Sequence, residues 1–225
     1  MRVRVVVYNV WGFRQGADRV AAAVADHRPD VALIQECGSR RRLKRFARLL
    51  EMEGVSTRLL PLVRQVRNAV LVRPSWRVVS SRLHRFERSQ RFYPRGAVIA
   101  VLGRAGYRIT AMSVHLGLTP KERVRHAREL TDLAVTDEPV LIGGDLNEGP
   151  DGRAASWVAD RLWDTSRGAA GHSPAPTFPS ADPTVRIDYL FASEHFHVES
   201  STVLDTPASR GASDHLPLLV EVELD

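Results

Sequence analysis

The stretch VLIGGDLNEGP (residues 140–150) decides the fold, because an apolar strand runs there into two glycines and then into polar residues. Asp145 and Asn147 alternate with Leu146, so on an extended backbone their side chains share a face, and the two glycines before Asp145 leave room for a substrate. Carboxylate and amide oxygens suit Mg²⁺ or Mn²⁺. Because the same residue types are common in turns, this stretch alone indicates either a metal-dependent site or a polar turn.

The composition indicates a globular chain that is basic and rich in arginine. Its 225 residues are 44% hydrophobic, which is enough for a full core, and we expect one domain over residues 1–225. Lys and Arg total 32 against 26 acidic residues, giving a net charge of +6, and all but Lys44 and Lys121 of these bases are arginine. Arginine matches phosphate with its planar fork of donors, although a GC-rich coding sequence would produce the same bias.

Cysteine usage and hydropathy bear on the cellular setting. Cys37 is the only cysteine, which excludes an internal disulfide and a Cys-based zinc site and fits a cytoplasmic protein. The apolar run at the N-terminus is short, and no run approaches transmembrane length. We therefore expect no signal peptide, no stable membrane insertion and a monomer.

Hydrophobic periodicity predicts strands and helices along most of the chain. The first strand, helix and second strand form a βαβ-like unit whose strands end in Asn9 and Glu36, where open sheets bind their ligands. Residues 151–182 are rich in Pro, Ser and Ala and read as a surface excursion. The predicted strands are residues 3–10, 31–36, 68–72, 76–80, 96–102, 107–115, 185–191 and a closing strand after residue 215, and the predicted helices are residues 17–28, 40–50, 120–135 and 154–162.

Two helix starts have specific capping signals. Thr119, Pro120 and Glu122 form a capping box with proline at the first helical position. Ser39 precedes a basic amphipathic segment whose apolar residues share one face. These signals fix where the two helices begin.

A run of arginines without acidic residues extends from residue 54 to residue 86, and such local charge asymmetry attracts polyanions. Because alternate strand residues point to opposite sides, we expect roughly three or four of these arginines to share a phosphate-binding face. The alternative is a solvated surface. The candidates are Arg64, Arg67, Arg73, Arg77, Arg82, Arg85, Arg88, Arg91 and Arg95.

Polar residues recur at the ends of separate strands in the segments YNVWG, LIQE, VHLG, GGDLNEGP, RIDYLF and SDHLPL. In this order the segments resemble the endonuclease/exonuclease/phosphatase superfamily, which includes DNase I, exonuclease III-type AP endonucleases, neutral sphingomyelinases and inositol-polyphosphate 5-phosphatases. The resemblance covers nearly the whole chain. It implies a four-layer α/β sandwich, with two mixed sheets face to face and helices outside, and hydrolysis of phosphate esters with Mg²⁺ or Mn²⁺.

The resemblance also implies roles for individual residues. Glu36 corresponds to the principal metal ligand, with Asn9 and Asp214 beside it. The other five would act on the substrate: Asp145 and Asn147 would hold the nucleophilic water and a phosphate oxygen, and His215, oriented by Asp188, would sit against the scissile phosphate, with His115 completing the set.

Two positions refine the resemblance. AP endonucleases of the exonuclease III type carry tyrosine where this chain has His115, whereas the DNase I-like, sphingomyelinase-like and phosphatase members carry histidine. The segment RNAVLV resembles a family GNA segment, but Arg67 stands where glycine is usual.

Three functions remain open at this point. The first is a metal-dependent nuclease of modest specificity that acts on DNA. The second is a phosphodiesterase or phosphatase that acts on a lipid headgroup, an inositol phosphate or a nucleotide, because these motifs bind the phosphate and say little about what is attached to it. The third is a protein without activity that binds nucleic acid on a relic site.

Overall fold

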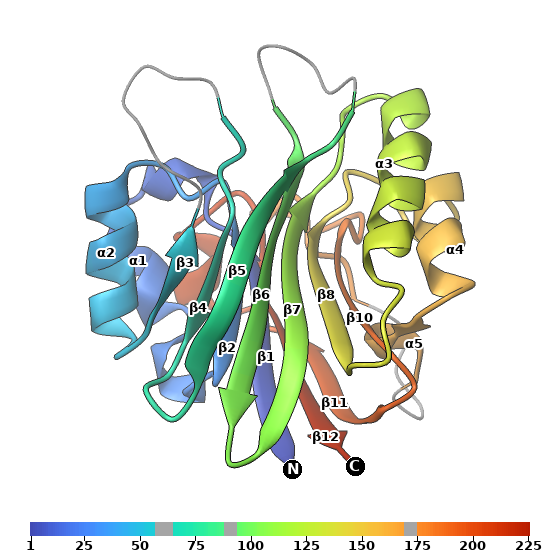
Figure 1. Ribbon diagram of the computed structural model, residues 1–225. Coiled ribbons are helices and arrows are strands. Elements are labelled where there is room, and N and C mark those ends of the chain that lie inside the picture. Colours follow the sequence, from blue (N-terminus) through green and yellow to red (C-terminus); the bar gives the residue numbers. More distant parts are fainter. Residues whose placement is uncertain (57–64, 88–93, 169–174) are drawn as a thin grey trace.

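The computed structural model describes residues 1–56, 65–87, 94–168 and 175–225. Within these ranges the strands form two six-stranded mixed sheets packed face to face, with helices on the outer faces (Figure 1). Sheet A has the spatial order β11 (Phe196–Val203), β12 (Leu218–Leu224), β1 (Arg2–Asn9), β2 (Val31–Gln35), β4 (Ala69–Val72) and β3 (Glu53–Ser56). Sheet B has the order β5 (Arg77–Arg85), β6 (Gly96–Arg104), β7 (Tyr107–His115), β8 (Val140–Asp145), β10 (Asp188–Ala192) and β9 (Trp163–Asp164).

The helices complete a four-layer α/β sandwich, which confirms the predicted fold class. They cover the outer face of sheet A on one side and of sheet B on the other (Figure 1). No helix in the described ranges is long and apolar enough to cross a membrane. The α-helices are α1 (Ala17–Ala22), α2 (Arg40–Leu49) and α6 (Pro207–Arg210) beside sheet A, α3 (Pro120–Leu133) and α4 (Arg153–Ala159) beside sheet B, and α5 (Thr165–Gly168), with short 3-10 turns at Trp11–Phe13 and Ala25–His27.

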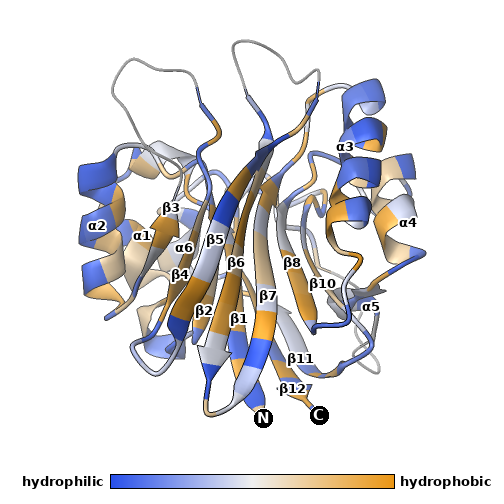
Figure 2. Cartoon of the chain, viewed as in Figure 1, coloured by the Kyte–Doolittle hydropathy of each residue, from blue (hydrophilic) through white to orange (hydrophobic). Residues whose placement is uncertain are grey.

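Three apolar layers hold these parts together. Along β1, Val3, Val5 and Val7 point into the layer between the two sheets, whereas Val6 and Tyr8 point into the layer under α1 and α2. A third layer lies between sheet B and the helices α3 and α4. Figure 2 shows the result, with apolar strands inside and polar outer faces on the helices. Burial on both faces explains why residues 5–8 of β1 form a continuous hydrophobic run.

Each sheet has one parallel pair near its centre. β1 runs parallel to β2 in sheet A, as the βαβ-like pattern predicts, and β7 runs parallel to β8 in sheet B. Parallel neighbours end at the same edge of a sheet. The carboxyl ends of these four strands therefore form the edge at which ligands of open sheets bind.

The glycines of β8 serve packing and not substrate entry, so the expectation that they leave room for a substrate is wrong. A Cβ on Gly143 would lie 2.6 Å from side-chain atoms of Val7 and Leu33 in the facing sheet. A Cβ on Gly144 would lie 1.9 Å from the backbone oxygen of Val114 in the neighbouring strand. Both positions are buried. The missing side chain of Gly143 allows the two sheets to approach closely just below the site, and that of Gly144 allows β7 and β8 to do so.

The predicted capping signals are confirmed. Thr119 and Glu122 form the capping box at the start of α3, and the Ser39 side chain accepts a hydrogen bond from the backbone N–H of Arg42 at the start of α2. Both interactions are local in sequence. Residues within one helical turn therefore suffice to place these helix starts.

Several predicted elements have different bounds. The helix predicted at residues 17–28 ends at Ala22, because Val24 leaves helical geometry with φ of −133° and buries its side chain under sheet A. β5 runs to Arg85, well beyond the predicted end at residue 80, and β10 begins at Asp188 and not at residue 185. Two strands at the edges of sheet A, β3 and β11, were not predicted.

Candidate active site

The polar residues at the strand ends meet at one edge of the sandwich. In sheet A, Asn9 ends β1 beside the end of β2, and Glu36 follows β2 directly. In sheet B, the strand register places Asp145 between His115 on β7 and Asp188 on β10. The parallel strands contribute their last residues, and antiparallel β10 contributes its first. Residues separated by most of the chain thus become neighbours.

Asp145 is the centre of this cluster and is 2% exposed. Its Oδ2 accepts a hydrogen bond from Asn9 Nδ2 at 3.0 Å and lies 3.1 Å from His115 Nε2 and 3.8 Å from His215 Nε2. Its Oδ1 accepts a hydrogen bond from the backbone N–H of Asn147 at 2.8 Å. Because Asn9 belongs to sheet A and Asp145 to sheet B, this carboxylate joins the two sheets at the candidate site.

His215 is held by a second buried carboxylate. Its Nδ1 lies 2.8 Å from Oδ2 of Asp188, which is fully buried. Thr177 Oγ1 accepts a hydrogen bond from the backbone N–H of Asp188, and the Phe178 ring packs against the imidazole with 4.9 Å between ring centroids. The ring of His215 is therefore fixed, with Nε2 directed toward Asp145. This contact is the one that an orienting role for Asp188 requires.

These contacts shift the pKa values of the buried groups. Burial lowers the pKa of His215, but Asp188, and then Asp145 and Asp214, outweigh burial and raise it to about 10. Burial raises the pKa of Asp188, against the opposing charge of His215. Burial would also raise the pKa of Asp145, but His115 and His215 hold it below its usual value. At neutral pH the cluster therefore contains an imidazolium at His215 and a carboxylate at Asp145.

His115 is fixed by Arg95 on one side and Asp145 on the other. The Arg95 Nη1 atom lies 2.7 Å from the ring nitrogens of His115, and Nε2 also faces Asp145. A guanidinium can only donate, so the nitrogen that receives its hydrogen bond is unprotonated. Arg95 and Asp145 therefore hold the imidazole ring of His115 from two directions. Sequence patterns had grouped Arg95 with a surface face, and they gave no signal for this contact.

Of the residues predicted to bind metal, Asn9 ends β1, and Glu36 and Asp214 occupy the adjoining loops. Glu36 follows β2 with a positive φ of 53°, a backbone conformation that is uncommon outside glycine. The Oγ of Ser213 donates to the backbone oxygen of Asn9 at 2.7 Å, which places the neighbouring Asp214 at the same edge. Burial raises the pKa of Asp214, His215 opposes this rise, and the charge of Glu36 adds to it. The negative charge of Glu36 therefore acts on the carboxylate of Asp214.

A divalent cation fits this pair of carboxylates. It would relieve their repulsion, and the set is completed by Asn9 Oδ1, which accepts a hydrogen bond from the backbone N–H of Trp11 at 3.1 Å and keeps a second lone pair. Such an all-oxygen set suits Mg²⁺ or Mn²⁺.

A second group with metal-binding potential is formed by Asp145, Asp188 and His215, whose ligand atoms lie within 4.8 Å of one another in the described part of the chain. A histidine must be neutral to bind a metal. The raised pKa of His215, about 10, and its bond to Asp188 therefore disfavour that position.

Asn147 does not lie on the strand, so the expectation that it shares an extended face with Asp145 is wrong. β8 ends at Asp145, and Asn147 has a positive φ of 52°. The backbone N–H of Asn147 folds back to the Asp145 side chain, and its Nδ2 donates to the backbone oxygen of Leu116 at 3.1 Å. A turn that Asp145 itself stabilises brings the two side chains to the same edge.

The predicted arginine face divides between the two ends of the sandwich. Strand register places Arg85 beside Gly96, which pairs with His115 at the site end, whereas Arg77 pairs with Gly103 at the opposite end. Arg73 also lies at that far end, where it contacts the backbone oxygen of Pro29. The candidates Arg64, Arg88 and Arg91 lie outside the described residues. Of the described candidates, Arg67, Arg85 and Arg95 lie toward the site, and Arg82 lies between the two ends of β5.

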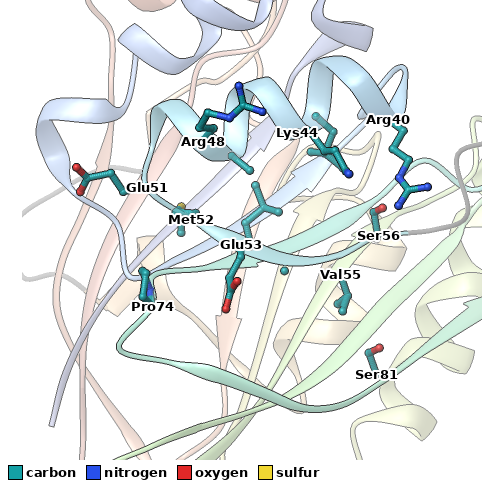
Figure 3. Close-up of a pocket in the computed structure, with 14 residues that line it drawn as sticks. Arg40, Lys44, Arg48, Glu51, Met52, Glu53, Val55, Ser56, Pro74 and Ser81 are labelled. Atoms are coloured by element: carbon teal, nitrogen blue, oxygen red, sulfur yellow. The ribbon is translucent and has the colours of Figure 1, made fainter.

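Cavities distinguish the site from the rest of the surface. A cavity of about 380 Å³ opens beside Glu36 and His115, between the loops that follow β1 and β2. A larger cavity of about 1080 Å³ lies elsewhere, between α2 and β3 (Figure 3). Arg40, Lys44 and Arg48 of α2 rim that cavity. Among its described lining residues there is no histidine, so these residues lack the paired groups of the strand-end cluster.

The segment before β10 contributes to the site although it was predicted to be a surface excursion. The backbone N–H of Leu216 donates to the backbone oxygen of Thr177, and that of Ser180 donates to the backbone oxygen of Asp214, both at 2.8 Å. Thr177 and Ser180 are buried. Residues 175–182 therefore clamp the loop that carries His215. In the sequence, the apolar residue Phe178 between two prolines was the available signal that this segment packs against the protein. It does not indicate that the segment packs against the His215 loop.

Comparisons with known proteins found a related sequence region and matching folds. The chain is 30% identical over 122 residues to the protein YbhP of Escherichia coli (strain K12), an alignment that covers 53% of this chain and about half, 48%, of that protein. Its fold matches the mannosyl-6-phosphatase of Bacteroides thetaiotaomicron VPI-5482 with a TM-score of 0.84 at 19% identity, covering 99% of this chain and 100% of that one.

It also matches TDP2 of D. rerio, solved with a single-strand DNA product, with a TM-score of 0.80 at 17% identity and 99% coverage of both chains. At these identities the structural matches show the fold alone. The model of the Endonuclease/Exonuclease/phosphatase family matches residues 6–215, and the chain therefore belongs to that family.

Proposed function

We propose that this protein hydrolyses phosphate esters at the strand-end cluster with the help of Mg²⁺ or Mn²⁺. The observation that carries the proposal is the buried Asp145 carboxylate, which contacts Asn9 across the sheets and lies within 3.8 Å of both His115 and His215. Carboxylate, amide and imidazolium groups around one open edge supply what attack on an anionic ester requires. Membership of the family supports the same reaction class.

The residues divide the chemistry between them. A divalent cation held by Glu36, Asp214 and Asn9 would neutralise negative charge on the phosphate. Asp145 is ionised and is suited to orient the attacking water, with Asn147 beside it. His215 carries a positive charge at neutral pH and is suited to stabilise a non-bridging oxygen of the phosphate.

Two buried groups support these roles. Asp188 fixes the imidazole of His215 and preserves its charge. His115 lies with Nε2 3.1 Å from Oδ2 of Asp145 and so limits the rotation of that carboxylate.

We infer that DNA is the substrate. Arg67, Arg85 and Arg95 at the site end offer guanidinium groups to a phosphate backbone, and TDP2 of D. rerio, which shares the fold, was solved with a DNA product. A small phosphoester is the second candidate. A cavity of about 380 Å³ is of a size suited to a small molecule, and another structural relative is a mannosyl-6-phosphatase.

The test is a substrate panel with the EDTA-treated protein before and after addition of Mg²⁺ or Mn²⁺. Plasmid DNA, a single-stranded oligonucleotide, an abasic duplex, sphingomyelin, mannose 6-phosphate and bis-p-nitrophenyl phosphate would be compared. We expect metal-dependent cleavage of DNA and of bis-p-nitrophenyl phosphate. Cleavage confined to mannose 6-phosphate or sphingomyelin would replace DNA with a small or lipid phosphoester.

Matched variants show whether the measured activity belongs to this site. His215→Ala should lower turnover by at least about a hundredfold, the scale for loss of a positioned acid or charge stabiliser. Asp137→Asn is the control, because Asp137 is exposed beyond the other end of β8. Silence on every substrate, combined with DNA binding, would replace hydrolysis with the relic-site alternative.

A further inference from the structure

The cavity beside Glu36 and His115 has a wall whose residues take no part in the chemical step assigned to the strand-end cluster. This wall carries Trp11, Arg14 and Arg67, from the loop after β1 and from the segment before β4. Glu36 is the one carboxylate among the described residues that line the cavity. With Glu36 assigned to a cation, the remaining charge of the wall is positive.

The backbone segments beneath this wall pack closely against one another. Gly12 donates its N–H to the backbone oxygen of Glu36 at 2.9 Å, and Gly38 follows with a positive φ of 43°. A Cβ on Gly38 would lie 2.5 Å from the backbone oxygen of Gly12, so only glycine allows the two loops to pack this closely. Trp11 also has a positive φ, 45°, so the loops adopt backbone conformations that favour one arrangement.

Arg67 is anchored on this base at both its main chain and its side chain. Its backbone oxygen accepts the N–H of Cys37 at 2.9 Å, and its Nη1 donates to the backbone oxygen of Gly38 at 2.7 Å. A guanidinium has five N–H donors, and the side-chain bond to Gly38 uses one of them. Within the described ranges Arg67 forms no ion pair with a carboxylate, although it is only partly exposed.

Arg14 adds a second guanidinium to the same cavity. Its Cζ lies over the Trp11 ring, 4.7 Å from the ring centroid, in a cation–π contact. Both residues line the cavity together with Arg67. Two supported guanidinium groups at one wall match the several acceptor oxygens and the charge of a phosphate.

We propose that Arg67 and the Arg14–Trp11 pair form a subsite for a second phosphate group of the substrate, separate from the phosphate that is hydrolysed. The inference rests on the proposed function for the position of the scissile phosphate. The second phosphate is either the neighbouring linkage of a nucleic-acid strand or the second phosphate of a small bisphosphorylated molecule. In both cases the subsite gives specificity for substrates with two phosphates.

The test compares paired substrates that differ only in the second charge. In the small-molecule arm, the p-nitrophenyl ester of thymidine 5′-phosphate is hydrolysed with and without a 3′-phosphate. In the strand arm, an oligonucleotide is cleaved with and without a neutral methylphosphonate beside the scissile linkage. We expect wild-type protein with Mg²⁺ to favour the doubly charged member through a lower KM, by at least about tenfold for one charge-assisted contact.

Arg67→Ala should remove most of this preference, so that kcat/KM falls at least about tenfold more for the doubly charged substrate than for its partner. Arg14→Ala, at an exposed position, should reduce the preference in the same direction. Arg77→Ala is the matched control, because Arg77 lies at the other end of sheet B, and it should keep the preference. Thermal melting of each variant separates loss of the subsite from loss of the fold.

Each outcome decides the inference. If the arginine variants change the preference in the small-molecule arm, a small molecule with two phosphates is sufficient to occupy the subsite. If they change it only in the strand arm, the subsite binds the neighbouring phosphate of a nucleic-acid strand. An equal loss on both members of a pair would show that Arg67 acts only through the Gly38 loop, and an unchanged preference would leave the wall without a ligand. Either result overturns the proposal.

A binding experiment covers the case in which no substrate is hydrolysed. Thymidine 3′,5′-bisphosphate and thymidine 5′-phosphate would be titrated against the protein in EDTA, with tryptophan fluorescence as the readout. Tighter binding of the bisphosphate that Arg67→Ala abolishes would support the subsite even though the proposed hydrolysis had failed. Equal binding of both nucleotides would reject the subsite independently of activity.

Discussion

Replacing Asp188 by Asn would test how the buried pair sets the charge of His215. The substitution keeps the shape of the side chain and removes the carboxylate whose Oδ2 lies 2.8 Å from His215 Nδ1. Both groups are buried, so solvent screens the interaction little. We expect a lower pKa of His215 and a less well-defined orientation of its imidazole ring.

The size of the effect follows from the pKa of His215. Its rise from 6.5 to about 10 corresponds to roughly 5 kcal/mol in favour of the imidazolium, at about 1.36 kcal/mol per pKa unit. Asp188 makes the largest of three carboxylate contributions. At least a third of the total, on the order of 1–2 kcal/mol, should therefore disappear, which lowers the pKa of His215 by about one unit.

Two assays measure this change. Titration of the His215 ring C–H resonance by NMR in EDTA should show the lower pKa directly. Turnover on bis-p-nitrophenyl phosphate at neutral pH should fall by about a hundredfold, the scale seen when a group that orients a catalytic residue is lost. The exposed Asp137→Asn variant should change neither value. An unchanged titration of His215 with near wild-type turnover would refute the role assigned to Asp188.

Three further results are expected. Glu36→Gln should raise the Mg²⁺ concentration needed for half-maximal hydrolysis by about tenfold or more, because an anionic ligand is lost, and a wild-type Mg²⁺ dependence would contradict its assignment. Gly144→Ala should lower the free energy of unfolding in urea by about 1–3 kcal/mol or more, since the new Cβ meets the backbone oxygen of Val114 at 1.9 Å. A urea unfolding curve like that of wild type would show that β7 and β8 can move apart without a loss of stability. The protonated His215 should contribute stability in EDTA that is complete below pH 6.5 and disappears as the pH rises through about 10, because folding raises its pKa. The free energies of unfolding in urea of wild type and His215→Gln should therefore differ more at pH 6 than at pH 10. An equal difference at both pH values would contradict the raised pKa.

Sequence patterns predicted the structural elements that depend on residues close together in the chain. The capping box of Thr119 and Glu122 and the N-cap at Ser39 need only residues within one turn, and both helices begin where expected. The parallel arrangement of β1 and β2 follows from a short connection of helical character. The four-layer architecture, in contrast, came from the resemblance to a family, because alternating strands and helices are compatible with several layer orders.

Contacts between distant segments were not predictable from patterns. Asn9 and Asp145 are 136 residues apart, and nothing in either segment indicates that an amide on one sheet will bond a carboxylate on the other. The contact of Arg95 with His115 has the same character. Backbone geometry also escaped prediction, since Glu36 adopts positive φ without being glycine. Such features arise when packing of the whole chain outweighs local preference.

The most direct test of the central claim is metal add-back to EDTA-treated protein with bis-p-nitrophenyl phosphate as substrate. Wild-type protein should be inactive in EDTA and recover as Mg²⁺ or Mn²⁺ is added. Asp145→Asn in parallel should stay at least about a hundredfold slower at every metal concentration, because it loses the carboxylate that orients the water. Full hydrolysis in EDTA, or Asp145→Asn protein that recovers to the wild-type rate, would contradict metal-assisted phosphoester hydrolysis at this cluster.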